Sequence, residues 1–413
     1  MTATETKAPG SAAVFWRYWT GSTISGLGTA VTSVALPLTA VEVVHASAVM
    51  VAVIAASEFI AWPVLGLPAG VLVSRLPLRG TQIVMDLVRA VAIGSIPVVA
   101  WTAALSSVQL VAVALVVGVA NVVFSIGNST MMPAIVSTEE LTKRNSLNSA
   151  TGGAVQMAGP GLGGLLVQVM GAAACMVTDS ASYLLSAVLL RALPRPEKLP
   201  GSERGDSVHQ QIKEGIAFIT RHPVIRVCVA DATFINFVGG GLMALVPLFL
   251  VRTLHEHSWV VGLVYAAEGV GSLTGASLTP RLTEAWGSAR VCQRCAALMP
   301  AALVLLPLAF RGWGVVVFAL GEVLFAGAVV PSSVVTRTHR HRVVPPELLP
   351  RVMATVRVVS WGAIPVGALV AGGVATIVGV RSALFVLAAL AACAPLTLWS
   401  SVEMRRRVNL EDD

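Results

Sequence analysis

Charged side chains are scarce in this sequence. Asp, Glu, Lys and Arg together make up 12% of the 413 residues, whereas hydrophobic residues make up 55%. A soluble domain carries roughly 25% charged residues, so this chain has too few to cover a water-exposed surface. The mean hydropathy is +0.80. The composition therefore excludes an ordinary soluble protein and indicates a chain that lies largely within a lipid bilayer.

Motifs of enzymes and metal proteins are also missing from the sequence. No P-loop occurs, so the chain has no nucleotide site of that type to drive transport by ATP hydrolysis. There is no Gly-x-Ser-x-Gly elbow and no His-Glu-x-x-His zinc motif. Cys292 and Cys295 form one Cys-x-x-Cys pair, without the second pair of a four-ligand zinc site. We therefore expect no enzymatic activity, no cofactor and no bound metal.

Long apolar segments recur along the whole chain, each close to the roughly 20 residues that a helix needs to cross a bilayer. The first 14 residues are small and polar, so we expect no cleavable signal peptide and a first span that remains as an anchor. Twelve spans are predicted, at residues 16–40, 47–73, 82–103, 107–131, 147–170, 171–191, 223–251, 258–281, 290–310, 313–336, 350–375 and 378–400.

The distribution of basic residues tests this count. With twelve spans and a cytoplasmic N-terminus, 25 of the 28 Lys and Arg residues fall on inside segments or adjoining helix ends, and the exceptions are Arg252, Arg311 and Arg381. This is the positive-inside asymmetry. We therefore predict a multi-pass protein of the inner (cytoplasmic) membrane with both termini in the cytoplasm. The net charge of +7 then faces anionic lipid and not nucleic acid.

The longest segment between spans lies in the middle of the chain and divides it. Leu193-Pro-Arg-Pro196 is typical of a linker, and Ile212, Ile216 and Ile219 at helical spacing predict a short amphipathic helix on the membrane surface. The predicted organisation is a tail at 1–15, a six-helix bundle at 16–191, the linker at 192–222, a second bundle at 223–400 and a tail at 401–413.

The segment after the second span carries the first family resemblance. Residues 66–79 read Gly-Leu-Pro-Ala-Gly-Val-Leu-Val-Ser-Arg-Leu-Pro-Leu-Arg, and Asp86 and Arg89 follow. The segment resembles the Gly-x-Leu-Ala-Asp-Arg signature loop of the major facilitator superfamily, although Ser74 stands where that family usually has Asp. The resemblance implies a cytoplasmic latch, and the alternative is that the charges only fix the topology. The implied gating residues are Gly66, Gly70, Arg75, Arg79, Asp86 and Arg89.

Residues 158–164, Ala-Gly-Pro-Gly-Leu-Gly-Gly, resemble the antiporter motif of the same superfamily. Proline removes a helix hydrogen bond and glycines allow close helix contact, so such a helix can bend and slide. The implied hinge residues are Gly159, Pro160, Gly163 and Gly164, with simple packing as the alternative. Residues 214–223 resemble the entry to the seventh span in exporters of macrolides and of enterobactin. The fold implied is an all-α membrane protein of twelve transmembrane helices in two six-helix bundles.

Acidic side chains inside the spans are candidates for proton coupling. A carboxylate in hydrocarbon is costly and takes up a proton more readily than one in water. The candidates are Glu58, Asp179, Asp231, Glu268 and Glu322. In the first span, Thr29 stands where the resembled branch often has an acid. The candidates for lining a substrate cavity are Asn121, Asn128, Gln156, Asn236, Trp62 and Trp361. For every one of these residues, a fixed contact with a neighbouring helix is the alternative.

The sequence as a whole predicts a secondary active transporter that exports amphipathic small molecules, such as antibiotics or other secondary metabolites, by proton antiport with alternating access. We expect an apolar cavity with a few carboxylates, suited to bulky or cationic solutes. The expected partners are the substrate, protons and the lipid bilayer, and we expect a monomer. The alternatives are a dedicated siderophore exporter, an uptake permease of the same fold and a membrane receptor that transports nothing.

Overall fold

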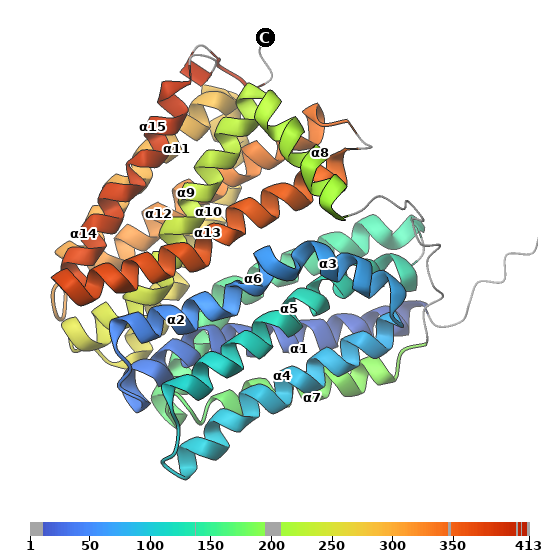
Figure 1. Cartoon of the computed structure of the whole chain (residues 1–413), viewed down its shortest axis with the longest axis vertical. Coiled ribbons are helices and arrows are strands. Elements are labelled where there is room, and N and C mark those ends of the chain that lie inside the picture. The colour runs from blue at the N-terminus through green and yellow to red at the C-terminus, as the bar shows by residue number, and fades with distance from the viewer. Residues whose placement is uncertain are drawn as a thin grey trace, which may run out of the picture.

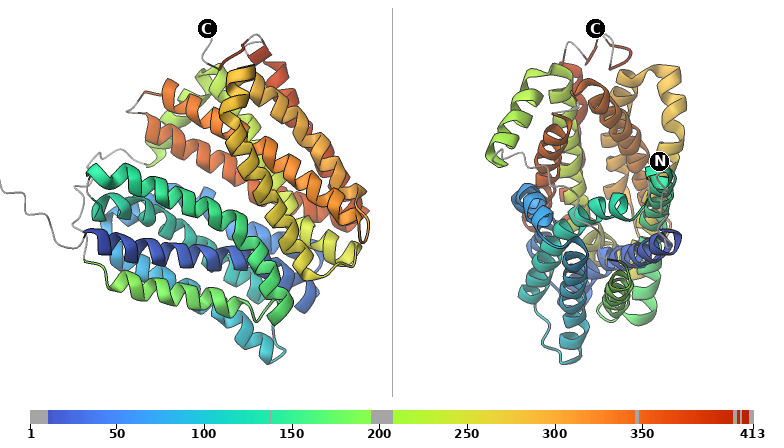
Figure 2. Two further views of the ribbon diagram at one scale, coloured as in Figure 1. Left: turned by 180° about the vertical axis from the view of Figure 1, so that it is seen from behind. Right: turned by 90° about the vertical axis from the view of Figure 1, so that its right-hand side faces the viewer.

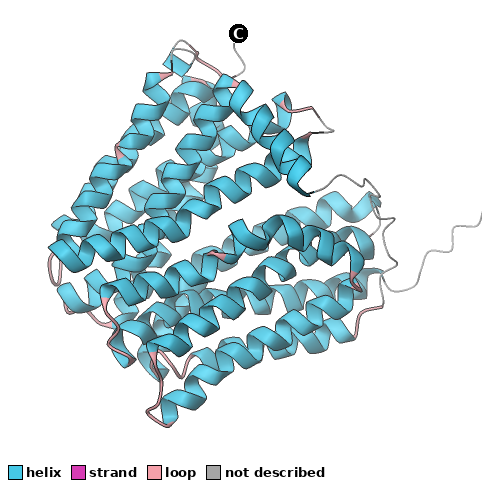
Figure 3. Cartoon of the chain, viewed as in Figure 1, coloured by secondary structure: helices cyan, strands magenta, loops and turns pink. Residues whose placement is uncertain are grey.

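The computed structural model describes residues 11–136, 138–194, 208–345, 348–401, 404–405 and 407–410, and within these ranges it contains helices and no strand (Figure 3). The helices are α1 (Ser11–Leu38), the π-helical turn η1 (Thr39–Val43), α2 (Ala48–Phe59), α3 (Ala61–Arg75), α4 (Leu78–Trp101), α5 (Ser107–Ile135), α6 (Thr138–Met170), α7 (Met176–Arg191), α8 (Val208–Arg221), α9 (Pro223–Leu248), the π-helical turn η2 (Phe249–Thr253), α10 (Ser258–Trp286), α11 (Ser288–Leu308), α12 (Gly314–Val343), α13 (Leu349–Val378), α14 (Val380–Ala391) and α15 (Cys393–Ser400).

Each predicted span corresponds to one helix or to two helices placed end to end, so the all-helical fold is confirmed. A proline explains the break between α2 and α3. Pro63 has no N–H for the carbonyl of Phe59, and the chain turns at Ile60 between α2 and α3. Glycines in the left-handed region, Gly171 and Gly379, terminate α6 and α13 at φ of 86° and 84°. Both glycines lie at the boundaries that the sequence predicted between adjacent spans.

Among the described helices, nine segments are long and apolar enough to cross a membrane. The predicted spans outside this set are α6, α7 and α10. Helix α7 has only 16 residues, and α6 and α10 are richer in glycine and polar residues. These two helices pack against each other, and a Cβ added to Gly164 would lie 2.5 Å from the Cα of Gly262. Their low hydropathy therefore suits close contact between helices.

The helices form two groups (Figure 1). In the first, α1 packs against α6 and α7, and α4 against α5 and α7. In the second, α9 packs against α13, and α12 against α10 and α11. The two groups meet where α2 packs on α13 and where α6 packs on α10. Figure 2 shows both groups from behind and from the side. The division of the chain into two bundles and a linker, as drawn from the sequence, is retained as a proposal.

Helix α8 lies within the predicted linker, at the end of the molecule that we call the linker end. Its Ile219 is buried in one cluster with Val352 and Val356 of α13, and Glu214 forms an ion pair with Arg351. Ile216, in contrast, is exposed. The apolar face of this amphipathic helix is therefore partly covered by α13, which differs from a helix that rests on lipid alone.

The opposite end of the molecule, which we call the closed end, contains an internal repeat. Residues 37–48 and 247–258 have the same structure position by position: a proline inside the helix, a π-helical turn, a histidine in the left-handed region and the start of the next helix. His45 and His255 have φ of 52° and 55°. In this register, Glu42 of η1 is equivalent to Arg252 of η2.

These two turns join the groups at the closed end. The Arg252 guanidinium donates hydrogen bonds to the carbonyl oxygens of Ala46 at 2.7 Å and Val41 at 2.9 Å. In the same direction, from the second group to the first, the Ser258 hydroxyl donates to a carboxylate oxygen of Glu42. Glycines allow close contact nearby, since a Cβ on Gly372 of α13 would lie 2.3 Å from the Cβ of Ala52 on α2. Here the two groups are in direct contact.

Candidate functional site: a basic cavity and two buried acid networks

A cavity of about 630 Å³ lies between the two groups. Its lining comes from α3, α5, α9, α12 and α13. In each span, with α2 and α3 counted as one and α9 counted with η2, the lining residues lie between the middle of the span and the linker end. Trp62, Gly66 and Ile126 come from the first group, and the remaining lining residues come from the second. The cavity therefore lies on the linker side of the contacts that join the groups at the closed end.

Charge in this cavity is of one sign. Three arginines line it, Arg337 and Arg340 from α12 and Arg357 from α13, and the lining residues include no Asp or Glu in the part of the chain that the structure describes. Within the same part, none of the three forms an ion pair with a carboxylate. This cavity differs from the expected one, which was apolar with a few carboxylates.

Two tryptophans and one arginine form a contact across the groups inside the cavity. The guanidinium of Arg357 lies 4.0 Å from the ring centre of Trp62 and 4.4 Å from that of Trp361. The two rings meet edge to face, with centres 4.8 Å apart. Trp62 belongs to α3, whereas Trp361 and Arg357 lie one turn apart on α13. Cation–π contacts thus hold the guanidinium in place without an anionic partner.

The predicted cavity residues divide into those that line the cavity and those that do not. Trp62, Trp361 and Asn236 line it, and so does Gly66 of the signature loop. Three others lie elsewhere: Asn121 accepts a hydrogen bond from Arg89, Asn128 accepts one from Tyr18, and Gln156 is exposed on α6 outside the lining.

The sequence pattern predicts the cavity arginines only as basic residues that fix the topology. The tenth span was expected to end at residue 336, which placed Arg337 and Arg340 in a loop, whereas α12 continues to Val343. Arg357 lies inside the eleventh span, and its position there was the available signal, because a charged side chain within a span is a functional candidate by default.

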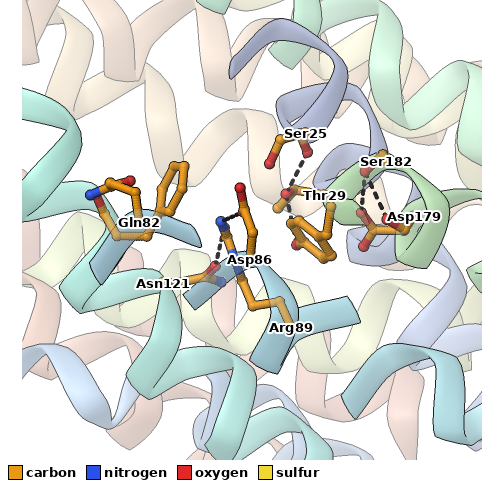
Figure 4. Close-up of polar contacts among 10 residues, drawn as sticks. Ser25, Thr29, Gln82, Asp86, Arg89, Asn121, Asp179 and Ser182 are labelled. Carbon is orange, nitrogen blue, oxygen red and sulfur yellow. Dashed lines mark hydrogen bonds and ion pairs between the residues drawn. The ribbon is translucent and has the colours of Figure 1, made fainter. Parts of the chain in front are cut away.

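Inside the first group, a buried ion pair connects three helices (Figure 4). Arg89 donates to Asp86 on the same helix, α4, and to the Asn121 amide oxygen of α5 at 3.1 Å. Its guanidinium lies 3.9 Å from the ring centre of Phe124 and 4.3 Å from that of Tyr183 on α7. Both members of the pair are buried. These two predicted gating residues therefore sit within the helix group.

Asp179 of α7 forms the second part of this network (Figure 4). The carboxylate is 0% exposed and accepts hydrogen bonds from Thr32 at 2.5 Å and Ser182 at 3.1 Å. It lies against Gly28 of α1, where a Cβ would come 2.3 Å from its Oδ1. The first span lacks an acid after Gly28, and the structure places a carboxylate from α7 beside the same turn.

The second group holds three further acids of the predicted set. Asp231 of α9 is buried and accepts a hydrogen bond from Ser332 at 3.3 Å. Glu322 of α12 is also buried, and Glu268 and Tyr265 of α10 lie within its electrostatic reach. One oxygen of Asp231 and one of Glu322 have no hydrogen-bond partner among the described residues. These acids lie outside the cavity lining.

Two other predicted residues contact the backbone or mark close approach of helices. Arg79 donates to the carbonyl oxygen of Leu193, which fastens the start of α4 to the end of α7. Glu58 lies on α2, where the missing side chain of Gly118 allows α5 to approach the Glu58 carbonyl. Gly70 and Arg75 lie on α3, and the surroundings of their side chains lie outside the described part of the molecule.

The four residues of the antiporter-like motif lie in the middle of α6. A Cβ on Gly159 would come 2.4 Å from the Cβ of Ala30 on α1, and one on Gly163 would come 3.0 Å from the Cα of Val31. Gly164 faces α10 of the other group, and Pro160 lies inside the helix. The motif thus contacts α1 within its own group and α10 across the interface.

Comparisons with known proteins agree with this architecture. The family described as transmembrane secretion effector (MFS_3) matches residues 4–411. An uncharacterised MFS-type transporter, y4rN of Sinorhizobium fredii, is 31% identical over 284 residues, which cover 66% of this chain and 67% of that protein. The multidrug efflux pump Tap of Mycolicibacterium fortuitum is 25% identical over 265 residues, which cover 61% of this chain and 63%, less than two thirds, of Tap.

Among solved structures, the nucleoside transporter NupG superposes with a TM-score of 0.76 at 11% sequence identity, over 95% of this chain and 99% of that one. At this level of identity, the likeness concerns the fold alone.

Proposed function

Because the chain belongs to the transmembrane secretion effector family of the major facilitator superfamily, we propose that it exports amphipathic small molecules, such as antibiotics or other secondary metabolites, by proton antiport. One observation carries this proposal. The cavity lies between two helix groups that are joined at the closed end, while all its lining comes from the linker halves of the spans, with α2 and α3 counted as one span and α9 with η2 as another. Such a site is suited to alternating access, in which the groups rock around it.

The proposed orientation places the linker end in the cytoplasm of the cell, with both termini there and the chain in the cytoplasmic membrane. Arg252, Arg311 and Arg381, the three basic residues outside the cytoplasmic set, lie at or near the closed end. Placing this end outside the cell satisfies the positive-inside rule. The cavity then lies on the cytoplasmic side, where an exporter collects its substrate.

Proton coupling is proposed for the buried acids. An unpartnered carboxylate oxygen in a low-dielectric interior is costly, and taking up a proton removes that charge. Glu322, with one such oxygen and Glu268 within reach, is the favoured site in the second group. The Asp86–Arg89–Asp179 network is a second candidate in the first group. Proton uptake at either place would change the contacts between α10 and α12, or between α1, α4 and α7.

Export is favoured over the alternatives by one relative. Tap is a multidrug efflux pump, whereas the likeness to NupG concerns the fold alone. A dedicated siderophore exporter has the same direction and fold and differs only in substrate. An uptake permease of the same fold is the opposite case, and the direction of transport distinguishes it.

The test begins with a susceptibility panel in a host that lacks its own efflux pumps. Compounds whose toxicity the full chain lowers are then offered to inside-out membrane vesicles with an acidic lumen. We expect accumulation that requires the pH gradient. Glu322→Gln should abolish most of this accumulation while leaving expression intact, and Glu284→Gln, which changes an exposed acid near the linker end, serves as the matched control.

Accumulation that persists without a pH gradient would refute proton antiport. Transport only in the opposite direction, from outside to inside, would replace the exporter by a permease. Full activity in Glu322→Gln, in Glu268→Gln and in the double variant would remove the second-group carboxylates from the mechanism.

A further inference from the structure

We infer that the cavity takes an organic anion with a flat aromatic body, such as an aromatic carboxylate, sulfonate or phosphate. This inference rests on the proposed export function and names the substrate class of the same cavity. It departs from the sequence-based expectation of a cationic solute. The reasons are the sign of the charge in the cavity, the position of its arginines and the aromatic contact between the two groups.

In the absence of an anion, Arg337 repels both of the other cavity arginines. Arg337 lies within electrostatic reach of both Arg340 and Arg357, and within the described residues no carboxylate forms an ion pair with any of the three. Like charges in a partly desolvated space raise the free energy of the empty site. A bound anion relieves this repulsion, whereas a bound cation increases it.

The depth of Arg357 and the burial of Arg340 exceed what topology requires. A basic residue fixes topology from the membrane surface, but Arg357 lies eight residues beyond the start of α13, or about 12 Å along the helix axis. Arg340 is only 8% exposed, and its Nε donates to the Thr336 carbonyl at 3.2 Å. This bond fixes the side chain of Arg340 and leaves its two terminal nitrogens as donors for a ligand.

The guanidinium group also suits the proposed ligand chemically. Its planar donors match the oxygens of a carboxylate, sulfonate or phosphate in pairs. Arg357 is held over Trp62 and Trp361 at 4.0 and 4.4 Å, so its donors are oriented before a ligand binds. The two indole rings offer stacking surfaces for a flat apolar body. The volume of about 630 Å³ lies within the usual size range of small-molecule sites.

The contact between the groups links binding to movement. Trp62 belongs to the first group, and Trp361 with Arg357 belongs to the second. An anion that engages Arg357 and stacks on these rings touches both groups at once. Such a ligand therefore has contacts that change when the groups rock, which is the condition for a ligand to shift a conformational equilibrium.

The experiment measures binding alone, so that it does not depend on proton coupling. The full chain in lipid nanodiscs is titrated against two xanthene dyes of similar shape, the anionic 6-carboxyfluorescein and the cationic rhodamine 6G, with fluorescence anisotropy as the readout and empty nanodiscs as the blank. We expect the anionic dye to bind at least about tenfold more tightly.

Variants locate the site. Arg357→Gln and Arg340→Gln should each weaken binding of the anionic dye by about tenfold to a hundredfold, the effect of losing a charge-assisted hydrogen bond. Arg357→Lys retains the charge but not the flat stacking group, so it should lose about threefold to tenfold. Arg311→Gln removes an exposed arginine outside the cavity and should leave binding unchanged.

Equal or tighter binding of rhodamine 6G would overturn the inference. Binding of the anionic dye that is unaffected by both glutamine substitutions would also overturn it, because the dye would then bind elsewhere. Arg357→Lys serves if a glutamine variant fails to fold, and wild-type affinity in this variant would refute the aromatic contact. Charge-selective binding without any protection in the susceptibility panel would refute the proposed export and leave the ligand class standing.

Discussion

Arg252 offers the most direct test of how the closed end is held shut. The side chain leaves η2 in the second group and donates two hydrogen bonds to carbonyl oxygens of the first group, Ala46 at 2.7 Å and Val41 at 2.9 Å. Arg252→Ala removes both bonds and leaves the helices themselves intact. We expect this variant to populate a form that is open at this end.

The size of the effect follows from these two bonds. A hydrogen bond to a charged group contributes roughly 1.5–3 kcal/mol. The guanidinium of Arg252 is only half-buried, and water replaces the carbonyl oxygens when the end opens. We therefore expect a net loss of about 1–3 kcal/mol for the pair. This corresponds to a change of about 5–150-fold in the ratio of closed to open molecules.

The distance between two spin labels, measured by double electron–electron resonance, reports this ratio. Thr102 and Arg311 are exposed residues in the loops α4–α5 and α11–α12 at the closed end, and both can carry a label through an introduced cysteine. Arg252→Ala should add a longer distance to the distribution or increase its share.

The chain contains a matched control for this experiment. Arg381 also donates to two carbonyl oxygens, Pro307 at 2.7 Å and Ala309 at 3.0 Å, but both belong to its own group. Arg381→Ala should lower thermal stability without changing the label distance. If Arg252→Ala and Arg381→Ala give the same distance distribution as the parent chain, the closed end is not held by Arg252 and the reasoning fails.

Three further substitutions test packing and charge elsewhere. Gly28→Ala should lower the melting temperature, because its Cβ would come 2.1 Å from the Ser182 hydroxyl and overpacking costs about 1–3 kcal/mol. Gly152→Ala is the control, since a Cβ there meets nothing within 4 Å, and equal melting temperatures of the two variants would contradict the packing argument. Asp86→Asn leaves Arg89 buried without its carboxylate, so we expect the folded state to lose about 3–5 kcal/mol of stability. The loss should be seen as poor yield or early thermal aggregation, and a melting curve like that of the parent chain would contradict it. Gly262→Ala should separate α6 from α10 and open the closed end, since its Cβ would lie 2.5 Å from the Cα of Gly164. The same spin-label assay measures this opening, and an unchanged label distance would show that the helices adjust to the added methyl group.

The spans were predictable because hydropathy and charge act locally along the chain. Apolar runs of sufficient length, basic residues between them and glycines such as Gly171 and Gly379 gave the helices and most of their boundaries. The amphipathic pattern of the linker likewise gave α8. The packing of α13 on the apolar face of α8 was not predictable, because Val352 and Val356 lie far from α8 in the sequence.

The candidate site was harder to predict because its chemistry depends on which side chains meet. Arg357 and Trp62 are almost 300 residues apart in the chain, and no local pattern joins them. A basic residue that fixes topology and one that binds an anion look alike in a sequence. Asp179 was among the predicted acids, but its position beside Gly28 was not predictable, for the same reason. Only the packing of α1 on α7 brings the acid to the position where the first span has none.

The equivalence of Glu42 and Arg252 has a consequence for how the two halves of the chain can assemble. Two copies of the first half would place a second Glu42 where Arg252 now donates to carbonyl oxygens, and Ala48, which stands in the place of Ser258, would offer no hydroxyl to the carboxylate. Two copies of the second half would place a second Arg252 where Glu42 now accepts from the Ser258 hydroxyl. The different residues at these matching positions thus favour pairing of the first half with the second over pairing of either half with a copy of itself.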